Sequence, residues 1–351
     1  MSGAPNKSRR ILELDGLRGV AILSVVLYHY FQRFPDYTPY GGRLFQWTEY
    51  GYLGVHLFFI VSGFVIAFTL ERTSGAATFF RNRFFRLWPA MVVSSLLTFS
   101  ILSIVDTPFA DFMHVGIRGF LPSWTFTAPF IWKPFIAVDN YIDGAYWSLF
   151  VEVRFYLWAI VVATFVGAKR LPAVLTGAVA VLAPVWHLSI NPPLMFYLET
   201  LFFVPYLPLF AAGALAHQAF INRDRGLALA GFALTWGATL SFLEFRGEII
   251  IVTIFFLAFL VLVVRRRWLH ALSATPLVWI GSISYSLYLL HQNIGVSLLS
   301  ALPVGWPTWF YILAVLAVFG VVVCLAQLVF VGVERPMQMF ARRFDKRATA
   351  A

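Results

Sequence analysis

Near the start of the chain the sequence reads Leu14-Asp15-Gly16-Leu17-Arg18, continues through Gly19–Tyr28, and reaches His29. The stretch is otherwise largely apolar, which predicts a membrane helix carrying two ionisable side chains at separate levels. A helix would place Arg18 and His29 about 16 Å apart along its axis. Arg18 would lie near one membrane face and His29 near mid-bilayer, where ionisable groups are unfavourable and are therefore functional candidates. The alternative for His29 is a packing hydrogen bond.

The composition predicts an all-α, polytopic transmembrane helical bundle. Of the 351 residues, 60% are hydrophobic and only 12% are charged, against about 25% charged in soluble domains. The single cysteine excludes a disulfide within the chain. About ten helices are expected, each able to cross roughly 30 Å of hydrocarbon. Their ranges are 17–32, 52–70, 87–105, 146–167, 172–190, 197–218, 227–243, 248–264, 276–299 and 308–332.

The distribution of charge predicts the orientation of this bundle. The net charge is +10, and most of the 26 Lys and Arg residues fall in alternate connecting segments, on the side of the N-terminus. By the positive-inside rule, both termini are cytoplasmic, and a membrane rather than a nucleic acid explains the excess. We expect one membrane-embedded domain, 1–351, in a bacterial inner (plasma) membrane. It would have cytoplasmic tails at 1–13 and 333–351 and an ordered, aromatic-rich extracytoplasmic loop at 106–145.

Four intramembrane polar side chains are predicted to share the outer half of the bilayer: His29, His56, Glu152 and His291. Arg18 alone would lie near the inner end. Structural alternatives exist for several of these residues. Glu152 could pair with Arg154, and His56 could be an interfacial histidine. The basic residues have structural alternatives as well. Arg18 could join Glu13 and Asp15 in a cluster at the start of the helix. Arg81, Arg83 and Arg86 could simply be the basic residues that commonly flank a membrane helix on its cytoplasmic side.

Five motifs in order resemble the acyltransferase-3 family of integral-membrane enzymes that O-acylate glycans and glycosides. The first is the Arg18-ten residues-His29 pattern. The others are Gly54-Val55-His56-Leu57-Phe58-Phe59, Arg83-Phe84-Phe85-Arg86-Leu87-Trp88-Pro89, Trp147-Ser148-Leu149-Phe150-Val151-Glu152 and Ser284-Tyr285-Ser286-Leu287-Tyr288-Leu289-Leu290-His291. Together they extend over nearly the whole chain. Relatives commonly have Asp at His56 and a second acid and Gln at Val153 and Arg154. No fused hydrolase-like domain follows, so the standalone form is expected.

The resemblance and the chemistry of the residues predict an O-acyltransferase. The donor would be cytoplasmic acyl-CoA, with acetyl as the expected acyl group. A hydroxyl of an extracytoplasmic or membrane-linked glycan or glycolipid would accept the acyl group. Arg18, Arg83 and Arg86 would bind the phosphates of coenzyme A. The catalytic pair would be His29 as general base and Glu152 as the group that orients or stabilises it.

The acceptor or the oxyanion would contact His56 and His291, and Trp147, Ser148 and Tyr285 are further substrate-binding candidates. Ser62 and Ser148 are conceivable nucleophiles if an acyl-enzyme forms, and direct transfer is the other route. No permanently bound cofactor, no metal and no nucleic-acid partner is expected. The partners are acyl-CoA, the acceptor and membrane lipids.

Two other classes of function remain open at this level. A proton-coupled transporter or flippase of lipid-linked sugars would also place His and Glu inside the membrane, although no internal repeat is visible. A non-catalytic scaffold would leave the shared depth of His29 and Glu152 unexplained.

Overall fold

In the computed structural model, residues 10–73, 75–222 and 225–348 are described; they form helices and connecting loops, with no strand among them. Three of the basic residues that count toward the predicted orientation, Lys7, Arg9 and Arg223, lie outside these residues. The first half contains α1 Leu12–Phe31, α2 Gly54–Leu70, α3 Ala76–Ile104, α4 Pro108–Met113, α5 Phe120–Thr125, α6 Pro129–Trp132, α7 Trp147–Val162 and α8 Leu171–Leu188. The second half contains α9 Pro192–Phe202, α10 Leu207–Ile221, α11 Gly226–Leu240, α12 Arg246–Arg265, α13 Thr275–Ser282, α14 Ser284–Ser300, α15 Thr308–Val329 and α16 Arg335–Ala348.

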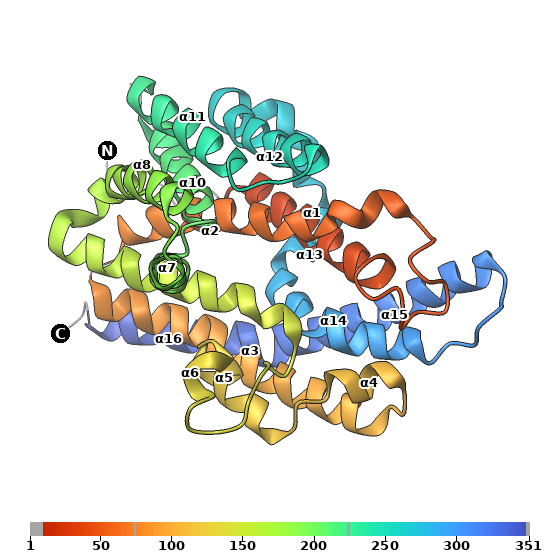
Figure 1. The fold of residues 1–351 in the computed structure, drawn as a ribbon. Coiled ribbons are helices and arrows are strands. Elements are labelled where there is room, and N and C mark those ends of the chain that lie inside the picture. Colours follow the sequence, from red (N-terminus) through yellow and green to blue (C-terminus); the bar gives the residue numbers. More distant parts are fainter. Residues whose placement is uncertain (1–9, 74, 223–224, 349–351) are drawn as a thin grey trace, which may run out of the picture.

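The bundle is arranged around α1 and α14. Figure 1 shows α8, α10, α11 and α12 on one side of α1 and α2, with α3, α14, α15 and α16 on the other. Helix α14 is buried along nearly its whole length, including its polar residues. A helix that is buried all round while carrying serines, tyrosines, a histidine and amides must find partners for these groups inside the protein.

Six helical stretches are long and apolar enough to cross a membrane, which makes the chain a multi-pass membrane protein. They are Gln46–Leu70, Ala76–Ile104, Gly144–Leu188, Pro192–Ile221, Arg246–Ser273 and Thr308–Phe344. The ranges predicted from sequence are largely helical as well. Two are interrupted: 197–218 breaks at Phe203, whose φ is 43°, just before Pro205, and 276–299 breaks at Ile283. The count of about ten crossings and the orientation of the termini stay predictions.

Helix α3 is longer than expected. The sequence predicts its start at residue 87, but the helix begins at Ala76 and continues through Pro89. Arg83 and Arg86 therefore lie on the helix itself rather than in a flank. The charged side chains of Arg81, Arg83 and Arg86 made this stretch resemble a cytoplasmic flank of the membrane helix.

Two segments outside the long helices are ordered. The 106–145 region contains the short helices α4, α5 and α6, and it buries Phe109, Val138 and Ile142, in agreement with an ordered cover. The predicted tail at 333–351 is instead helical as far as it is described. After α15, the π-helical turn Phe330–Glu334 leads into α16, which lies beside α3 (Figure 1).

Candidate active site

Three cavities follow one another through the bundle, and neighbouring cavities share lining residues. The first, the arginine cavity, has a volume of about 900 Å³ and is lined mainly by α1, α2, α3 and α16. The second, the neck, holds about 60 Å³. The third, the histidine cavity, holds about 520 Å³. Arg18, Arg83 and Arg86 line both the arginine cavity and the neck, while Val55 and Tyr288 line both the neck and the histidine cavity.

His29 lies near the end of α1, in the wall of the histidine cavity. Its Nδ1 atom is 2.8 Å from the carbonyl oxygen of Val25, one helical turn earlier. The same atom is 3.2 Å from Nε2 of His291 on α14. The sequence predicted that these two histidines share one level, and the structure brings them into direct contact.

The hydrogen bonds fix which ring nitrogen of each neutral histidine carries the proton. A carbonyl oxygen only accepts, so Nδ1 of His29 must donate to Val25. Nδ1 of His291 likewise donates to the carbonyl oxygen of Tyr288, at 2.8 Å. Nε2 of His291 is then a lone-pair acceptor that shares the Nδ1 proton of His29. The Nε2 atom of His29 keeps its lone pair, which is the form that a general base requires.

This arrangement corrects the expected role of His291. The sequence analysis placed it against the oxyanion or the acceptor, but the side chain is fully buried and does not line the histidine cavity. Its single ring proton is used in the bond to Tyr288. His291 contacts His29, and in this tautomer it has no second ring proton to donate to a substrate.

Glu152 is likewise not where the catalytic pair would need it. Its Oε1 atom accepts hydrogen bonds from Ser62 at 2.8 Å and from Tyr156 at 2.5 Å, and it lines the neck. No hydrogen bond joins Glu152 to His29 in the described part of the chain. The orienting contact comes from α14 instead, because α7 turns Glu152 toward the neck, one helical turn beyond Ser148.

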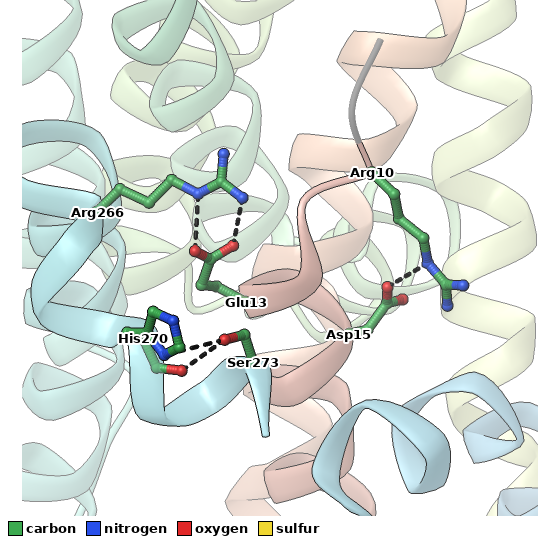
Figure 2. A network of polar contacts seen from close by, with 6 residues as sticks. All are labelled: Arg10, Glu13, Asp15, Arg266, His270 and Ser273. Atoms are coloured by element: carbon green, nitrogen blue, oxygen red, sulfur yellow. Dashed lines mark hydrogen bonds and ion pairs between the residues drawn. The ribbon is translucent and has the colours of Figure 1, made fainter. Parts of the chain in front are cut away.

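The acidic residues at the start of α1 have partners other than Arg18. Figure 2 shows Glu13 bonded by Arg266 and Asp15 bonded by Arg10. Both ion pairs are 2.6 Å at their closest. Arg18 donates only through Nε, to the hydroxyl of Ser284 at 3.2 Å. The alternative in which Arg18 pairs with Asp15 is therefore not formed, and the terminal nitrogens of Arg18 have no hydrogen-bond partner among the described residues.

The two arginines of α3 differ in their surroundings. Arg83 is buried, donates to Thr69 at 3.0 Å, and lies over the rings of Phe79 and Tyr156, each at 5.4 Å. Arg86 forms no hydrogen bond or ion pair within the described residues, although it lines both the arginine cavity and the neck. Guanidinium groups with free donors at a cavity wall are suited to bind an anion such as phosphate.

Tyrosines of α14 form the wall where the neck meets the histidine cavity. The Tyr288 hydroxyl lies 2.7 Å from that of Ser148 and donates to the Ala145 carbonyl oxygen at 2.9 Å. Tyr285 donates to the Leu87 carbonyl oxygen on α3 at 2.8 Å. Ser148 and Tyr285 both line the neck.

Aromatic side chains surround much of the histidine cavity. Trp147 and His56 both contact the ring of Tyr206, with centroids at 5.5 and 5.9 Å. Nδ1 of His56 is buried and has no hydrogen-bond partner among the described residues. Sequence reasoning missed a further set of lining residues, whose only signal was an aromatic or amide type near a motif: Tyr28, Tyr52, Tyr141, Tyr206, Gln292 and Asn293.

Asp143 fixes the 106–145 segment to α14. Its carboxylate accepts the backbone N–H of Ala145 at 2.8 Å and that of Asn293 at 3.0 Å. The Asn293 side chain in turn donates to the Ile142 carbonyl oxygen at 3.0 Å. Burial raises the pKa of Asp143 to about 7, although these two backbone donors act to lower it. Residues of this segment, among them Tyr141 and Gly144, thereby line the histidine cavity.

Arg154 has a structural role. It donates to the carbonyl oxygens of Glu199 (2.8 Å) and Thr200, near the end of α9. Both oxygens lie in the last turn of α9, where carbonyl groups run out of helical donors, and that of Glu199 also accepts the backbone N–H of Phe203 at 3.0 Å. The alternative pairing of Arg154 with Glu152 is not formed. No group of three or more His, Cys, Asp or Glu residues in the described ranges is arranged to hold a metal ion.

The structure thus defines a helical membrane protein in which an arginine-lined cavity, a neck and a cavity containing His29 share lining residues in that order. Comparison with known proteins identifies its class. An acyltransferase domain, that of the acyltransferase-3 family, matches residues 11–330. The chain belongs to this family, which supports an enzyme that transfers acyl groups.

Individual relatives agree with this assignment. Peptidoglycan O-acetyltransferase OatA of Listeria monocytogenes is 26% identical over 93% of this chain and 55% of its own. O-acetyltransferase OatA of Staphylococcus aureus is 27% identical over 86% of this chain and 54% of its own length. Acyltransferase MdmB of Streptomyces mycarofaciens is 30% identical over 44% of this chain and 39% of its own length. The chain therefore spans about half or less of the length of these relatives. No solved structure matches it significantly.

Proposed function

We propose that this protein transfers an acyl group, most simply acetyl, from cytoplasmic acyl-CoA to a hydroxyl of a glycan or glycolipid at the opposite membrane face. The observation that carries the proposal is the series of three cavities that share lining residues from one to the next. An arginine-lined cavity at one end leads through a neck to His29 at the other. Acyl-CoA has the matching shape, with anionic phosphates at one end, a thin pantetheine arm, and the thioester at the far end.

The donor end is supported by charge. Arg18 and Arg86 have free guanidinium nitrogens at the junction of the arginine cavity and the neck. Arg83 lies beside them. Bonds of guanidinium groups to phosphate are charge-assisted and stronger than neutral hydrogen bonds. The neck beyond them is largely apolar, lined by Phe58, Val61 and Leu149 among others, as an aliphatic arm requires.

The base is His29. As the acceptor hydroxyl attacks the thioester carbon, its proton passes to Nε2 of His29. The carbon–sulfur bond then breaks, and the leaving thiolate takes that proton from the imidazolium, which restores neutral His29. The imidazolium formed meanwhile keeps its Nδ1–H on the Val25 carbonyl oxygen and on Nε2 of His291. Both acceptors stabilise the positive charge, so His291 does here what a carboxylate does in a serine-hydrolase triad.

The acceptor side is supported by the histidine cavity and by the relatives. Trp147, Tyr206 and the free Nδ1 of His56 offer an aromatic and hydrogen-bonding wall. Two of the relatives are named as O-acetyltransferases, one of them of peptidoglycan, which favours a glycan acceptor. The proposal places the protein in the bacterial plasma membrane with both termini in the cytoplasm, as the positive-inside bias indicates.

The test is an assay of the purified protein in detergent. Acetyl-CoA is added with peptidoglycan fragments, and free CoA is measured with a thiol reagent while acetyl esters on the glycan are measured by mass spectrometry. We expect both products to form in equal amounts. A protein that releases no CoA in detergent but moves lipid-linked sugars across sealed vesicles would be a transporter, and the proposal would be wrong.

A further inference from the structure

Helix α16 contributes one wall of the arginine cavity, although none of the five sequence motifs lies on this helix. Three polar side chains of this helix line the cavity: Arg335, Gln338 and Arg342. They recur at spacings of three and four residues, so they lie on one face of the helix. The acyltransferase-family match ends at residue 330, so it does not include α16.

Helix α16 is held firmly enough to form a binding wall. Buried Glu334, at its start, accepts the Ser286 hydroxyl of α14 at 2.8 Å and the Gln338 amide at 3.0 Å. The ring of Phe340 packs edge-on against Phe85 of α3, with centroids 5.5 Å apart. These contacts fix the helix to both α14 and α3 and orient the Gln338 amide.

The arginine cavity carries an excess of positive charge. Six arginines line it against two carboxylates. Asp15 is neutralised by Arg10 at 2.6 Å, and Glu334 is occupied by Ser286 and Gln338. Arg335 and Arg342 are exposed and form no hydrogen bond or ion pair within the described residues. A cavity with this balance is suited to a ligand with several negative charges.

The positions of the arginines suggest two separate binding places for negative charge, one at the neck and one farther out in the cavity. Arg18, Arg83 and Arg86 line both the cavity and the neck, whereas Arg335, Gln338 and Arg342 line the cavity alone. In coenzyme A, the diphosphate is attached directly to the pantetheine arm, and the 3′-phosphate is on the ribose beyond it. A phosphate monoester carries about −1.5 to −2 charges at neutral pH.

We propose that Arg335, Gln338 and Arg342 on α16 bind the ribose 3′-phosphate of acyl-CoA, while the arginines at the neck bind its diphosphate. This inference rests on the proposed function, because it takes acyl-CoA as the donor. It assigns to α16 the discrimination between coenzyme A and dephospho-coenzyme A, which lacks only the 3′-phosphate.

The test compares two probes, coenzyme A and dephospho-coenzyme A, by calorimetric binding to the purified full chain. We expect the wild-type protein to prefer coenzyme A. In Arg342→Gln or Arg335→Gln the affinity for coenzyme A should fall about tenfold, while the affinity for dephospho-coenzyme A stays unchanged. Arg343→Gln is the matched control, since Arg343 is on the same helix but lines a separate surface with Pro336, Met337, Met339 and Phe340.

Each outcome separates this inference from the function on which it rests. If the α16 variants keep the wild-type preference, or if the wild type binds both probes equally, α16 does not bind the 3′-phosphate, and the acyltransferase proposal stands. If the wild type binds neither probe, the coenzyme A donor itself is wrong. Thermal unfolding of each variant shows whether a loss of affinity is local or comes from misfolding.

Discussion

At the scale of single residues, the chemistry of this protein depends on the hydrogen-bond partner of each buried polar side chain. His29 is held by a backbone carbonyl and by His291, and this pairing leaves its Nε2 atom as a base. We expect His29→Ala to lower acyl transfer by about 10² to 10⁴-fold, the usual contribution of a general base. The measurement is the rate of acetyl ester formation from acetyl-CoA.

A second buried histidine offers the control. His217 packs edge-on against the rings of Phe64 and Phe68, at 5.3 and 5.7 Å, and it lines none of the three cavities. His217→Ala removes the same volume from the bundle but should leave the transfer rate within about twofold, once corrected for folded protein. Full activity in a folded His29→Ala protein would exclude His29 as the base.

At the scale of helices, the passage depends on very close packing between backbones. Helices α2 and α10 meet at Gly63 and Gly213. A Cβ atom added at Gly213 would lie 2.0 Å from the Ile60 carbonyl oxygen, and one at Gly63 would lie 2.1 Å from that of Phe210. Small residues at helix crossings in membrane proteins allow such contact. The neck residue Ser62 is adjacent to this crossing, so the packing also sets its position.

Gly213→Ala should therefore destabilise the protein. Because both nearest atoms belong to rigid backbone, we expect a loss of about 1–3 kcal/mol, the range found for overpacked cores, seen as a lower unfolding temperature in detergent. Gly237→Ala on α11 is the matched control, since nothing lies within 4 Å of its added Cβ. That change should be neutral or stabilising, by up to about 1 kcal/mol of helix propensity. Equal effects of the two substitutions would argue against a backbone crossing.

At the scale of the whole molecule, the arrangement of cavities predicts a reaction across the membrane. The arginine cavity and the histidine cavity share no lining residue, and the neck shares lining residues with each of them. Donor and acceptor should therefore arrive from opposite faces. In oriented vesicles, acetyl-CoA supplied on the side of Arg10 and α16 should support acetylation of a glycan on the other side.

The opposite arrangement serves as the control for this experiment. Acetyl-CoA supplied only on the side of the histidine cavity should give little transfer, since the phosphates would meet no arginine cluster there. Product formed only when both substrates share the arginine side would contradict transfer across the membrane, although the protein would still be an acyltransferase. Vesicle integrity is checked with an entrapped dye.

By itself, the sequence determined what depends on local pattern: a helical membrane protein, the acyltransferase-3 family, and a level shared by His29 and His291. It also predicted an ordered 106–145 segment from its aromatic content. These features follow from hydropathy, helical rise and motif order, which are properties of neighbouring residues along the chain.

Only the tertiary structure decided which groups meet. Glu152 bonds to Ser62 and Tyr156 rather than to His29, and α16 rather than a tail forms a wall of the arginine cavity. Depth in the membrane follows from the helix rise, but it leaves open the direction in which a side chain faces and the helix it meets. That direction is set by the rotation and packing of helices far apart in sequence, such as α1 against α14.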